Sequence, residues 1–167
     1  PAAISGRTGV TAVAGDYVLL WDATDSTLKK ADVTDFISAV TASSTTTFTN
    51  KRITKRVTTL TDAATIAINS DNMDMGKVTL TASRTLGTPT GTPTDGQPLL
   101  LEVVQGGTGS YTLTVDSTST AGSYRFGSDV SGITLSTAVG KKDLILLTYL
   151  SDITGWAVAS ISKGYPA

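Results

Sequence analysis

The chain of 167 residues contains no cysteine and no histidine. Without cysteine, disulfides, thiolate metal sites and a cysteine nucleophile are excluded. Without histidine, the commonest general base and the commonest side-chain metal ligand are missing. Catalytic schemes that pair serine or cysteine with histidine, and the zinc-binding HExxH scheme, therefore cannot be built from this sequence. We expect a protein that is not an enzyme and that has no catalytic residues, no cofactor and no metal.

Charged residues and long apolar runs are also scarce. Charged residues make up 16% of the chain and the net charge is −1, against roughly 25% charged residues in ordinary soluble domains. A chain with no basic excess is not expected to bind nucleic acid. No apolar run approaches the roughly 20 residues that span a membrane, and the N-terminus has no signal-peptide pattern. Because removal of an initiator methionine can leave Pro1, we expect a protein completed in the cytoplasm, with no membrane partner.

Threonine is abundant, with about thirty copies, and β-branched residues favour extended chain. Short apolar-alternating segments are separated by Gly, Pro, Asn and Asp, and no helical pattern intervenes. This arrangement predicts an all-β protein, an antiparallel β-sandwich of the jelly-roll type. No fixed-period repeat is visible, so we do not predict a solenoid. The expected strands are 53–60, 65–69, 77–83, 97–105, 111–115, 124–126, 133–135, 143–150 and 155–161.

The composition divides the chain into two parts. Residues 1–14 are small and polar and are expected to form an arm, and the Ser/Thr-rich run at 41–50 is expected to be a linker. We therefore predict an N-terminal anchoring module at 1–49 and a β-sandwich domain at 50–167.

The N-terminal module is predicted to contain a hairpin and one short helix. Residues 16–21 and 28–31 are the expected strands, joined by turn-forming Asp and Ser residues. Asp32 or Thr34 can cap a short helix, whose apolar face would carry Phe36, Ile37 and Val40.

Several groups of residues invite a chemical interpretation that their spacing does not support. Asp22 and Asp25 lie in one turn, and 69–74 is rich in Asn and Asp, but neither has the spacing of a calcium loop. The Gly-rich segment 106–109 is followed by a strand pattern rather than by the Lys-Ser/Thr of a phosphate-binding loop, so we interpret it as a hairpin turn. Glu102 lies in an apolar strand, where an edge position or pairing with an arginine is expected rather than catalysis.

A basic cluster and a few aromatic residues are the remaining candidates for contacts. Lys51, Arg52, Lys55 and Arg56 begin the β domain. We interpret them first as a solvated strand edge that discourages unwanted pairing, and second as a contact for an acidic partner surface. Among the aromatic residues, Trp156 is expected in the core, whereas Tyr124 and Tyr165 are expected to be exposed.

Two stretches resemble phage proteins. Residues 15–22, followed by Leu28-Lys29-Lys30 and the segment 32–40, resemble a small module of phage fibre and other virion proteins, which commonly precedes a β-rich terminal domain. Residues 91–97, the apolar strand after them and residues 109–115 resemble the β-sandwich domain of phage tail-fibre and head-decoration proteins. The resemblance implies a homotrimer and carries over no catalytic residue.

The resemblance and the short length together favour a capsid decoration (cement) protein of a bacteriophage virion. We expect a homotrimer, assembled in the host cytoplasm, that stabilises the shell through contacts with the major capsid protein or other virion proteins. Its apolar contacts are expected at Leu19, Trp21, Phe36, Ile37 and Val40. The alternative is a short tail fibre or receptor-binding protein that binds host glycans through loops around 106–110 and 117–132.

Overall fold

A computed structural model describes residues 13, 15–32, 52–115 and 121–166 of the chain. It divides into two compact units, Pro1–Arg52 and Ile53–Ala167. The division falls three residues beyond the boundary expected from composition. Each unit is described by itself.

The described part of the first unit is a two-stranded antiparallel hairpin. Strand β1 (Tyr17–Asp22) pairs with β2 (Thr27–Asp32), so that Tyr17 lies opposite Asp32 and Trp21 opposite Leu28. The turn between the strands uses side chains to hold the backbone: Asp22 accepts a hydrogen bond from the Thr24 amide at 2.8 Å, and Asp25 accepts one from the Thr27 amide at 3.2 Å. Such bonds are the reason that Asp is favoured in tight turns. The short helix expected over 32–40 lies outside the described residues except for Asp32, which ends β2.

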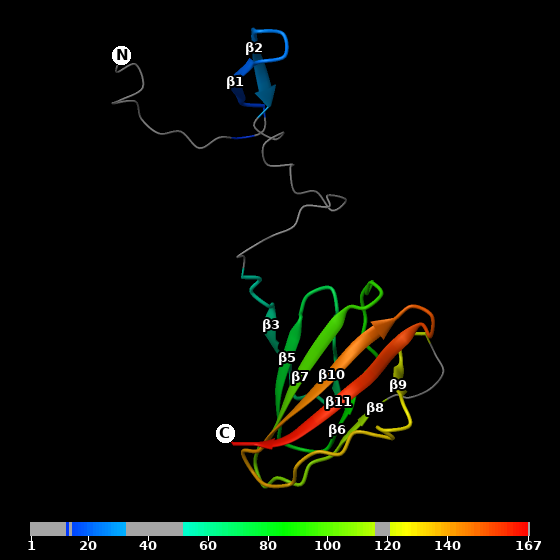
Figure 1. Ribbon diagram of the computed structural model, residues 1–167. Coiled ribbons are helices and arrows are strands. Elements are labelled where there is room, and N and C mark those ends of the chain that lie inside the picture. The colour runs from blue at the N-terminus through cyan, green and yellow to red at the C-terminus, as the bar shows by residue number, and fades with distance from the viewer. Residues whose placement is uncertain (1–12, 14, 33–51, 116–120, 167) are drawn as a thin grey trace, which may run out of the picture. The chain divides into compact units, whose positions relative to one another are not determined.

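The described residues of the second unit form nine strands in two sheets (Figure 1). The larger sheet has the order β3-β5-β7-β10-β11-β9, and the smaller has the order β4-β6-β8. The strands are β3 (Val57–Thr59), β4 (Thr65–Ile66), β5 (Met75–Leu80), β6 (Arg84–Leu86), β7 (Pro98–Gln105), β8 (Leu113–Val115), β9 (Tyr124–Phe126), β10 (Lys142–Leu150) and β11 (Gly155–Tyr165).

The chain alternates between the two sheets from β3 to β8. Strands β3, β5 and β7 lie side by side and parallel in the larger sheet, and β4, β6 and β8 lie side by side and parallel in the smaller one. Parallel neighbours need a crossover connection, which is usually a helix. Here the crossover is a short strand of the opposite sheet. From β3 to β8 the backbone therefore follows a coil, a superhelical path that passes three times through both sheets. The turns begin at Val57, Met75 and Pro98, and this unequal spacing leaves no fixed-period repeat in the sequence.

The predicted antiparallel jelly-roll sandwich is therefore wrong. Only β7, β10 and β11 form antiparallel pairs in the larger sheet, and β9 adds to β11 in parallel. The interpretation of 106–109 as a hairpin turn is wrong for the same reason, because the segment carries the chain from β7 to β8 in the other sheet. Each strand from β3 to β6 pairs with the strand two further along the chain rather than with the next one. The residues that form the connecting turns do not reveal this pairing. None of the described residues is helical.

One hydrophobic core fills the second unit and receives side chains from both sheets. In β7, Leu99, Leu101 and Val103 are buried, while the residues between them are only partly covered. Ile66 and Leu86 contribute from the smaller sheet. The remaining buried apolar residues are Leu60, Ile68, Met73, Val78, Leu80, Leu113, Tyr124, Leu135, Ile145, Leu147, Trp156 and Val158.

Candidate functional site

The most unusual surface in the described chain is the hairpin of the first unit. Successive residues of a strand point to opposite faces, and the register places the residues of β1 and β2 on two distinct faces. One face, which we call the apolar hairpin face, carries four large side chains: Tyr17, Leu19, Trp21 and Leu28.

All four of these side chains are exposed. The exposed fractions are 56% for Tyr17, 69% for Leu19, 64% for Trp21 and 62% for Leu28. Contiguous apolar surface of this kind is rare on soluble monomers and marks sites of interaction. A two-stranded hairpin alone is also only marginally stable in water. Covering this face would therefore both remove apolar surface from water and stabilise the hairpin.

The lysines of the hairpin, Lys29 and Lys30, each contact another side chain of the hairpin. On the opposite face, the Lys29 ammonium lies 2.7 Å from a carboxylate oxygen of Asp22 and 2.6 Å from one of Asp25. These interactions with Lys29 lower the pKa of both carboxyl groups. The turn carboxylates are thus paired with an ammonium group. On the apolar face, the Lys30 ammonium lies 4.2 Å from the centre of the Tyr17 ring, which is a cation–π contact.

The structure brings together two of the five expected apolar contact residues. Leu19 and Trp21 lie on the same face of the hairpin and are exposed. Phe36, Ile37 and Val40 lie outside the described residues. Tyr17 and Leu28 complete the face. Tyr17 was missed although its spacing of two from Leu19 signals the same face of a strand, and Leu28 was missed because its place depends on pairing between the strands. The register Trp21↔Leu28 was the missing information.

The basic cluster at the start of the second unit separates into residues with different roles; Lys51 lies outside the described residues. Arg56 holds the start of β5: its Nη2 lies 2.8 Å from Asp74 Oδ1, its backbone amide donates to Asp74 Oδ2 at 2.8 Å, and its Nη1 donates to the Asp71 carbonyl. The bond from Arg56 lowers the pKa of Asp74 to about 2. Arg52 and Lys55 are exposed beside it. Arg56 is therefore a structural residue, while Arg52 and Lys55 remain available for contacts.

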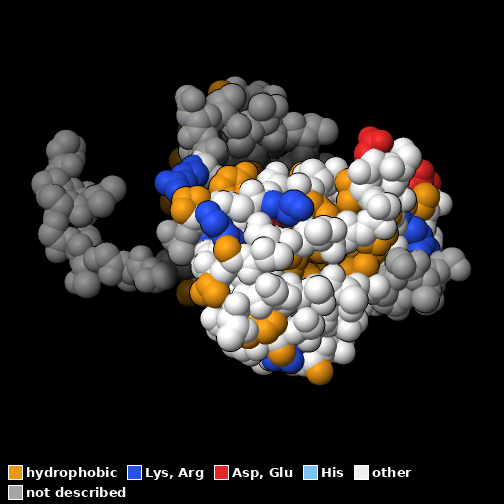
Figure 2. Space-filling view, turned by 90° about the horizontal axis from the view of Figure 1, so that it is seen from below, with side chains coloured by type: hydrophobic (Ala, Val, Ile, Leu, Met, Phe, Trp, Pro, Cys, Tyr) orange, Lys and Arg blue, Asp and Glu red, His pale blue; other side chains and the backbone are white. Residues whose placement is uncertain are grey.

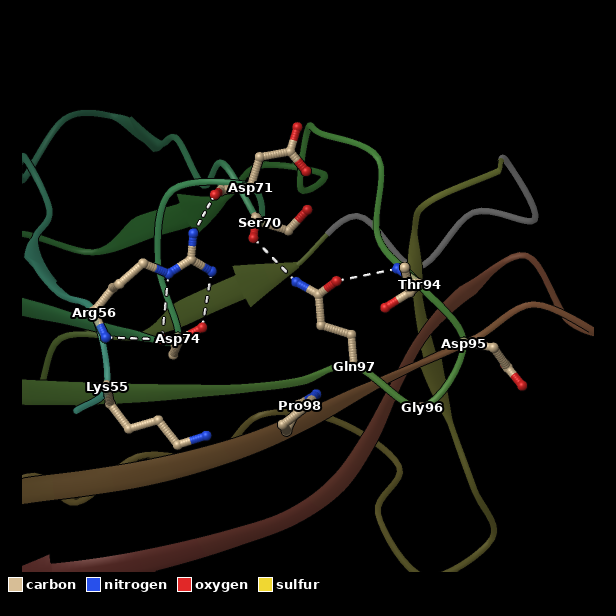
Figure 3. Close-up of a pocket in the computed structure, with 10 residues that line it drawn as sticks. All are labelled: Lys55, Arg56, Ser70, Asp71, Asp74, Thr94, Asp95, Gly96, Gln97 and Pro98. Carbon is tan, nitrogen blue, oxygen red and sulfur yellow. Dashed lines mark hydrogen bonds and ion pairs between the residues drawn. The ribbon is translucent and has the colours of Figure 1, made fainter. Parts of the chain in front are cut away.

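An open hollow of about 460 Å³ lies beside Arg56 (Figure 3). Its floor is fixed by Gln97, whose Nε2 donates to the Ser70 carbonyl at 3.0 Å and whose Oε1 accepts from the Thr94 amide at 3.0 Å. The Asp95 side chain points away from the hollow in this view and accepts a hydrogen bond from the Ser151 amide at 2.8 Å. The polar groups of the hollow thus fix its loops, and no aromatic side chain lines it for stacking.

The Asn- and Asp-rich segment 69–74 is also used internally. Asn69 accepts a bond from the Asp71 amide, Asp71 accepts one from the Thr92 amide at 2.8 Å, and Asp74 pairs with Arg56. Within the described ranges, no group of three or more acidic side chains is placed to hold a metal ion. Glu102 lies in the central strand β7, 3.6 Å from the Lys77 ammonium on β5.

Two large aromatic residues of the second unit, Trp156 and Tyr124, are in its core. Trp156 is fully buried, with its ring edge-on to Tyr149 at a centroid distance of 5.5 Å. Tyr124, expected to be exposed, is also fully buried, and its hydroxyl donates to the Gly87 carbonyl at 3.0 Å. That expectation was wrong because β9 pairs with β11 and turns Tyr124 inward. Burial raises the pKa of Tyr124. Tyr165, near the chain end, is 46% exposed.

The outer surface of the second unit is dominated by uncharged polar groups. Figure 2 shows one face, on which groups of apolar side chains lie among uncharged polar side chains and backbone atoms and charged side chains are few. On the smaller sheet, the register aligns Thr65, Thr85 and Thr114 in a row, and the last two hydroxyls lie 3.0 Å apart. In the part of the chain that is described, no helix is long and apolar enough to cross a membrane.

Comparison with known proteins adds no assignment: no family model, curated protein or solved structure matches this chain.

Proposed function

We propose that this chain is a structural protein of a bacteriophage virion, a homotrimeric capsid decoration protein that works by protein–protein contact. The observation that carries the proposal is the apolar hairpin face, on which Tyr17, Leu19, Trp21 and Leu28 are exposed together. A face of this kind needs a protein surface to cover it. The resemblance of 15–22 and 109–115 to virion modules supplies the class of particle.

The second unit suits a part that projects from a particle. Its core is continuous, and every buried side-chain nitrogen or oxygen among the described residues has a hydrogen-bond partner. A core whose buried polar atoms are all hydrogen-bonded favours a rigid, uniquely folded domain. On the smaller sheet its surface presents a row of threonines, Thr65, Thr85 and Thr114. The N-terminal unit would therefore make the contacts with other copies and with the major capsid protein, and the second unit would lie outside.

The proposal is tested with purified protein and with particles from which it is missing. We expect a homotrimer by light scattering and saturable binding to capsids that lack the protein. We also expect such capsids to withstand a higher temperature after binding. A monomer that fails to bind such capsids would overturn the proposal.

Immunogold labelling of whole particles locates the protein directly. Label distributed over the head is expected for a decoration protein. Label at the tail tip would overturn the decoration role and support the receptor-binding alternative, in which host glycans meet the loops of the second unit.

A further inference from the structure

The apolar hairpin face is divided lengthwise into an apolar and a partly polar column. Tyr17, Leu19 and Trp21 form a continuous column along β1. The facing column on β2 carries Leu28, Lys30 and Asp32, so that only its turn end is apolar. The apolar surface is therefore a narrow stripe with a charged border on one side.

We infer that this stripe is filled by the same stripe of other copies of the chain, so that the hairpin is the element that holds the oligomer together. The inference deepens the proposed function, on which it rests, by naming the occupant of the contact face. In this arrangement the apolar stripe, Leu28 included, faces the symmetry axis, and Lys30 and Asp32 lie towards solvent. Closed symmetric assemblies of identical chains arise from such self-complementary or cyclic contacts.

The charges on the apolar hairpin face are compatible with contact between two identical faces. The face carries one cation, Lys30, and one anion, Asp32, so two such faces do not repel each other. Lys30 already lies over the Tyr17 ring, 4.2 Å from its centre. It therefore borders the stripe rather than interrupting it. A partner chosen by charge would instead require a face with an excess of one sign.

The apolar area of the stripe is also large enough for an interface between identical chains. Large aromatic side chains bury 150–250 Å² each when fully covered. The two aromatic and two leucine side chains of the stripe are each more than half exposed and together offer on the order of 500 Å². Two such faces together remove about 1,000 Å² from water, which is the size at which a specific interface begins. The lone hairpin is also marginal in stability, and other copies of the chain are present from the time of synthesis. Self-association thus stabilises the hairpin before any capsid is met.

The open edge of the larger sheet is a weaker candidate for this role. Strand β3 is an edge strand, and Ile53 and Val57 beside it are exposed. However, Arg52 and Lys55 alternate with them on the same segment, and charged residues on an edge discourage strand pairing. The hairpin stripe carries no charge along β1 from Tyr17 to Trp21.

The first experiment compares two neighbouring leucines on opposite faces of β1. Leu19→Ser removes apolar surface from the stripe, whereas Leu20→Ser makes the same change on the other face. For Leu19→Ser we expect the light-scattering mass to fall to the 17.2 kDa of one chain, or the dissociation constant to rise at least tenfold. Leu20→Ser is expected to keep the wild-type mass. Equal effects of the two changes, or an unchanged mass in Leu19→Ser, would overturn the inference.

The second experiment uses the absence of cysteine, which makes a single introduced thiol unambiguous. Leu28→Cys places a thiol on the apolar hairpin face, and Thr27→Cys places one on the opposite face. Under mild oxidation we expect the Leu28→Cys variant to form covalent dimers at least ten times faster. Equal rates would contradict a shared stripe. The unfolding transition of the second unit, monitored in every variant, shows that the protein remains folded.

Capsid binding separates this inference from the function on which it rests. If Leu19→Ser remains an oligomer but no longer binds capsids, the stripe contacts the capsid and the inference fails while the proposed function stands. If the wild-type protein forms oligomers through the stripe but never binds capsids, the inference stands and the decoration role fails.

Discussion

The described part of the chain contains two antiparallel hairpins, β1–β2 and β10–β11, whose surroundings differ completely. In the β1–β2 hairpin every residue is exposed except Asp22, Ala31 and Asp32, which are partly buried. In the β10–β11 hairpin, alternate residues such as Ile145 and Leu147 are fully buried because a second sheet lies behind them. Both hairpins have apolar strands, so strand sequence alone does not say whether a face is internal. The apolar face that finds no second sheet within the described chain is the one left for a partner.

The two tryptophans of the chain differ in exposure in the same way as the two hairpins. Trp21 is 64% exposed on the apolar hairpin face, and Trp156 is 0% exposed in the core. Changes at these positions are expected to separate assembly from folding.

The largest effect is expected from Trp156→Ala. Removing the buried ring and its edge-on contact with Tyr149 should cost about 3–5 kcal/mol of unfolding free energy in the second unit. Trp21→Ala should leave that unfolding transition unchanged and weaken self-association instead. Urea unfolding followed by circular dichroism, together with light scattering, checks both. A destabilised second unit in Trp21→Ala would break the contrast between the two hairpins.

The second-largest loss of stability is expected from replacing Asp143, whose carboxylate is buried. It accepts hydrogen bonds from the Ser136 amide at 2.7 Å, the Ser136 hydroxyl at 2.7 Å and the Gly164 amide at 3.0 Å. Asp143→Ala leaves these donors without their acceptor, which should cost about 2–3 kcal/mol. Hydrogen exchange should rise at Ser136 and Gly164. The matched change in the hairpin, Asp25→Ala, should leave the second unit as stable as before, because the partners of Asp25 among the described residues, Thr27 and Lys29, lie in the β1–β2 hairpin.

Two glycines with positive φ offer a smaller and well-controlled comparison. Gly96 has φ +76° and open space where a Cβ would lie, so Gly96→Ala should cost about 1 kcal/mol for the backbone conformation alone. Gly109 has φ +72°, and an added Cβ would collide with the Thr137 carbonyl. Gly109→Ala should therefore be the more destabilising change, and equal melting temperatures for the two variants would contradict the packing of the 106–109 segment.

The strands of the second unit were largely predictable, whereas their partners were not. Alternation located β5, β7, β10 and β11 to within a few residues, because a half-buried strand needs one apolar face. The coil was not predictable: a strand was expected at 65–69, where β4 lies, but not its parallel pairing with β6, which spans only three residues. Segments so short show no periodicity. Strand β6 was missed entirely, and 133–135 was expected to be a strand although the structure has none there.

The candidate site could be predicted only in part. The apolar strand sequence 17–21 was sufficient to single out Leu19 and Trp21, which share an exposed face; their contact with a partner stays a prediction. Which face each residue occupies depends on the cross-strand register. The role of Arg56 was equally hidden, because its partners Asp71 and Asp74 are distant in sequence and meet it only after β3 pairs with β5.

The smallest expected effect is the response of the second unit to acid. Arg56 lowers the pKa of Asp74 from 3.8 to about 2, and Arg84, whose Nε lies 2.6 Å from the carboxylate, lowers the pKa of Asp62. A carboxyl group with a lowered pKa stabilises the folded state above its unfolded pKa, and this contribution is lost as the pH falls through the folded pKa. The unfolding free energy should therefore decline between about pH 3.8 and pH 2.

Asp74→Asn tests this source of acid sensitivity against the wild type. The variant should be slightly less stable near neutral pH, because Arg56 loses its ionised partner at the edge of the sheet. The difference from the wild type should then shrink as the pH falls from 3.8 towards 2, since the wild-type carboxylate becomes protonated over the same interval. Urea unfolding at pH 6, 3 and 2 measures the difference, and Arg56→Gln should give the same convergence. Parallel curves at all three pH values would show that the Arg56–Asp74 pair does not contribute to the stability of the second unit.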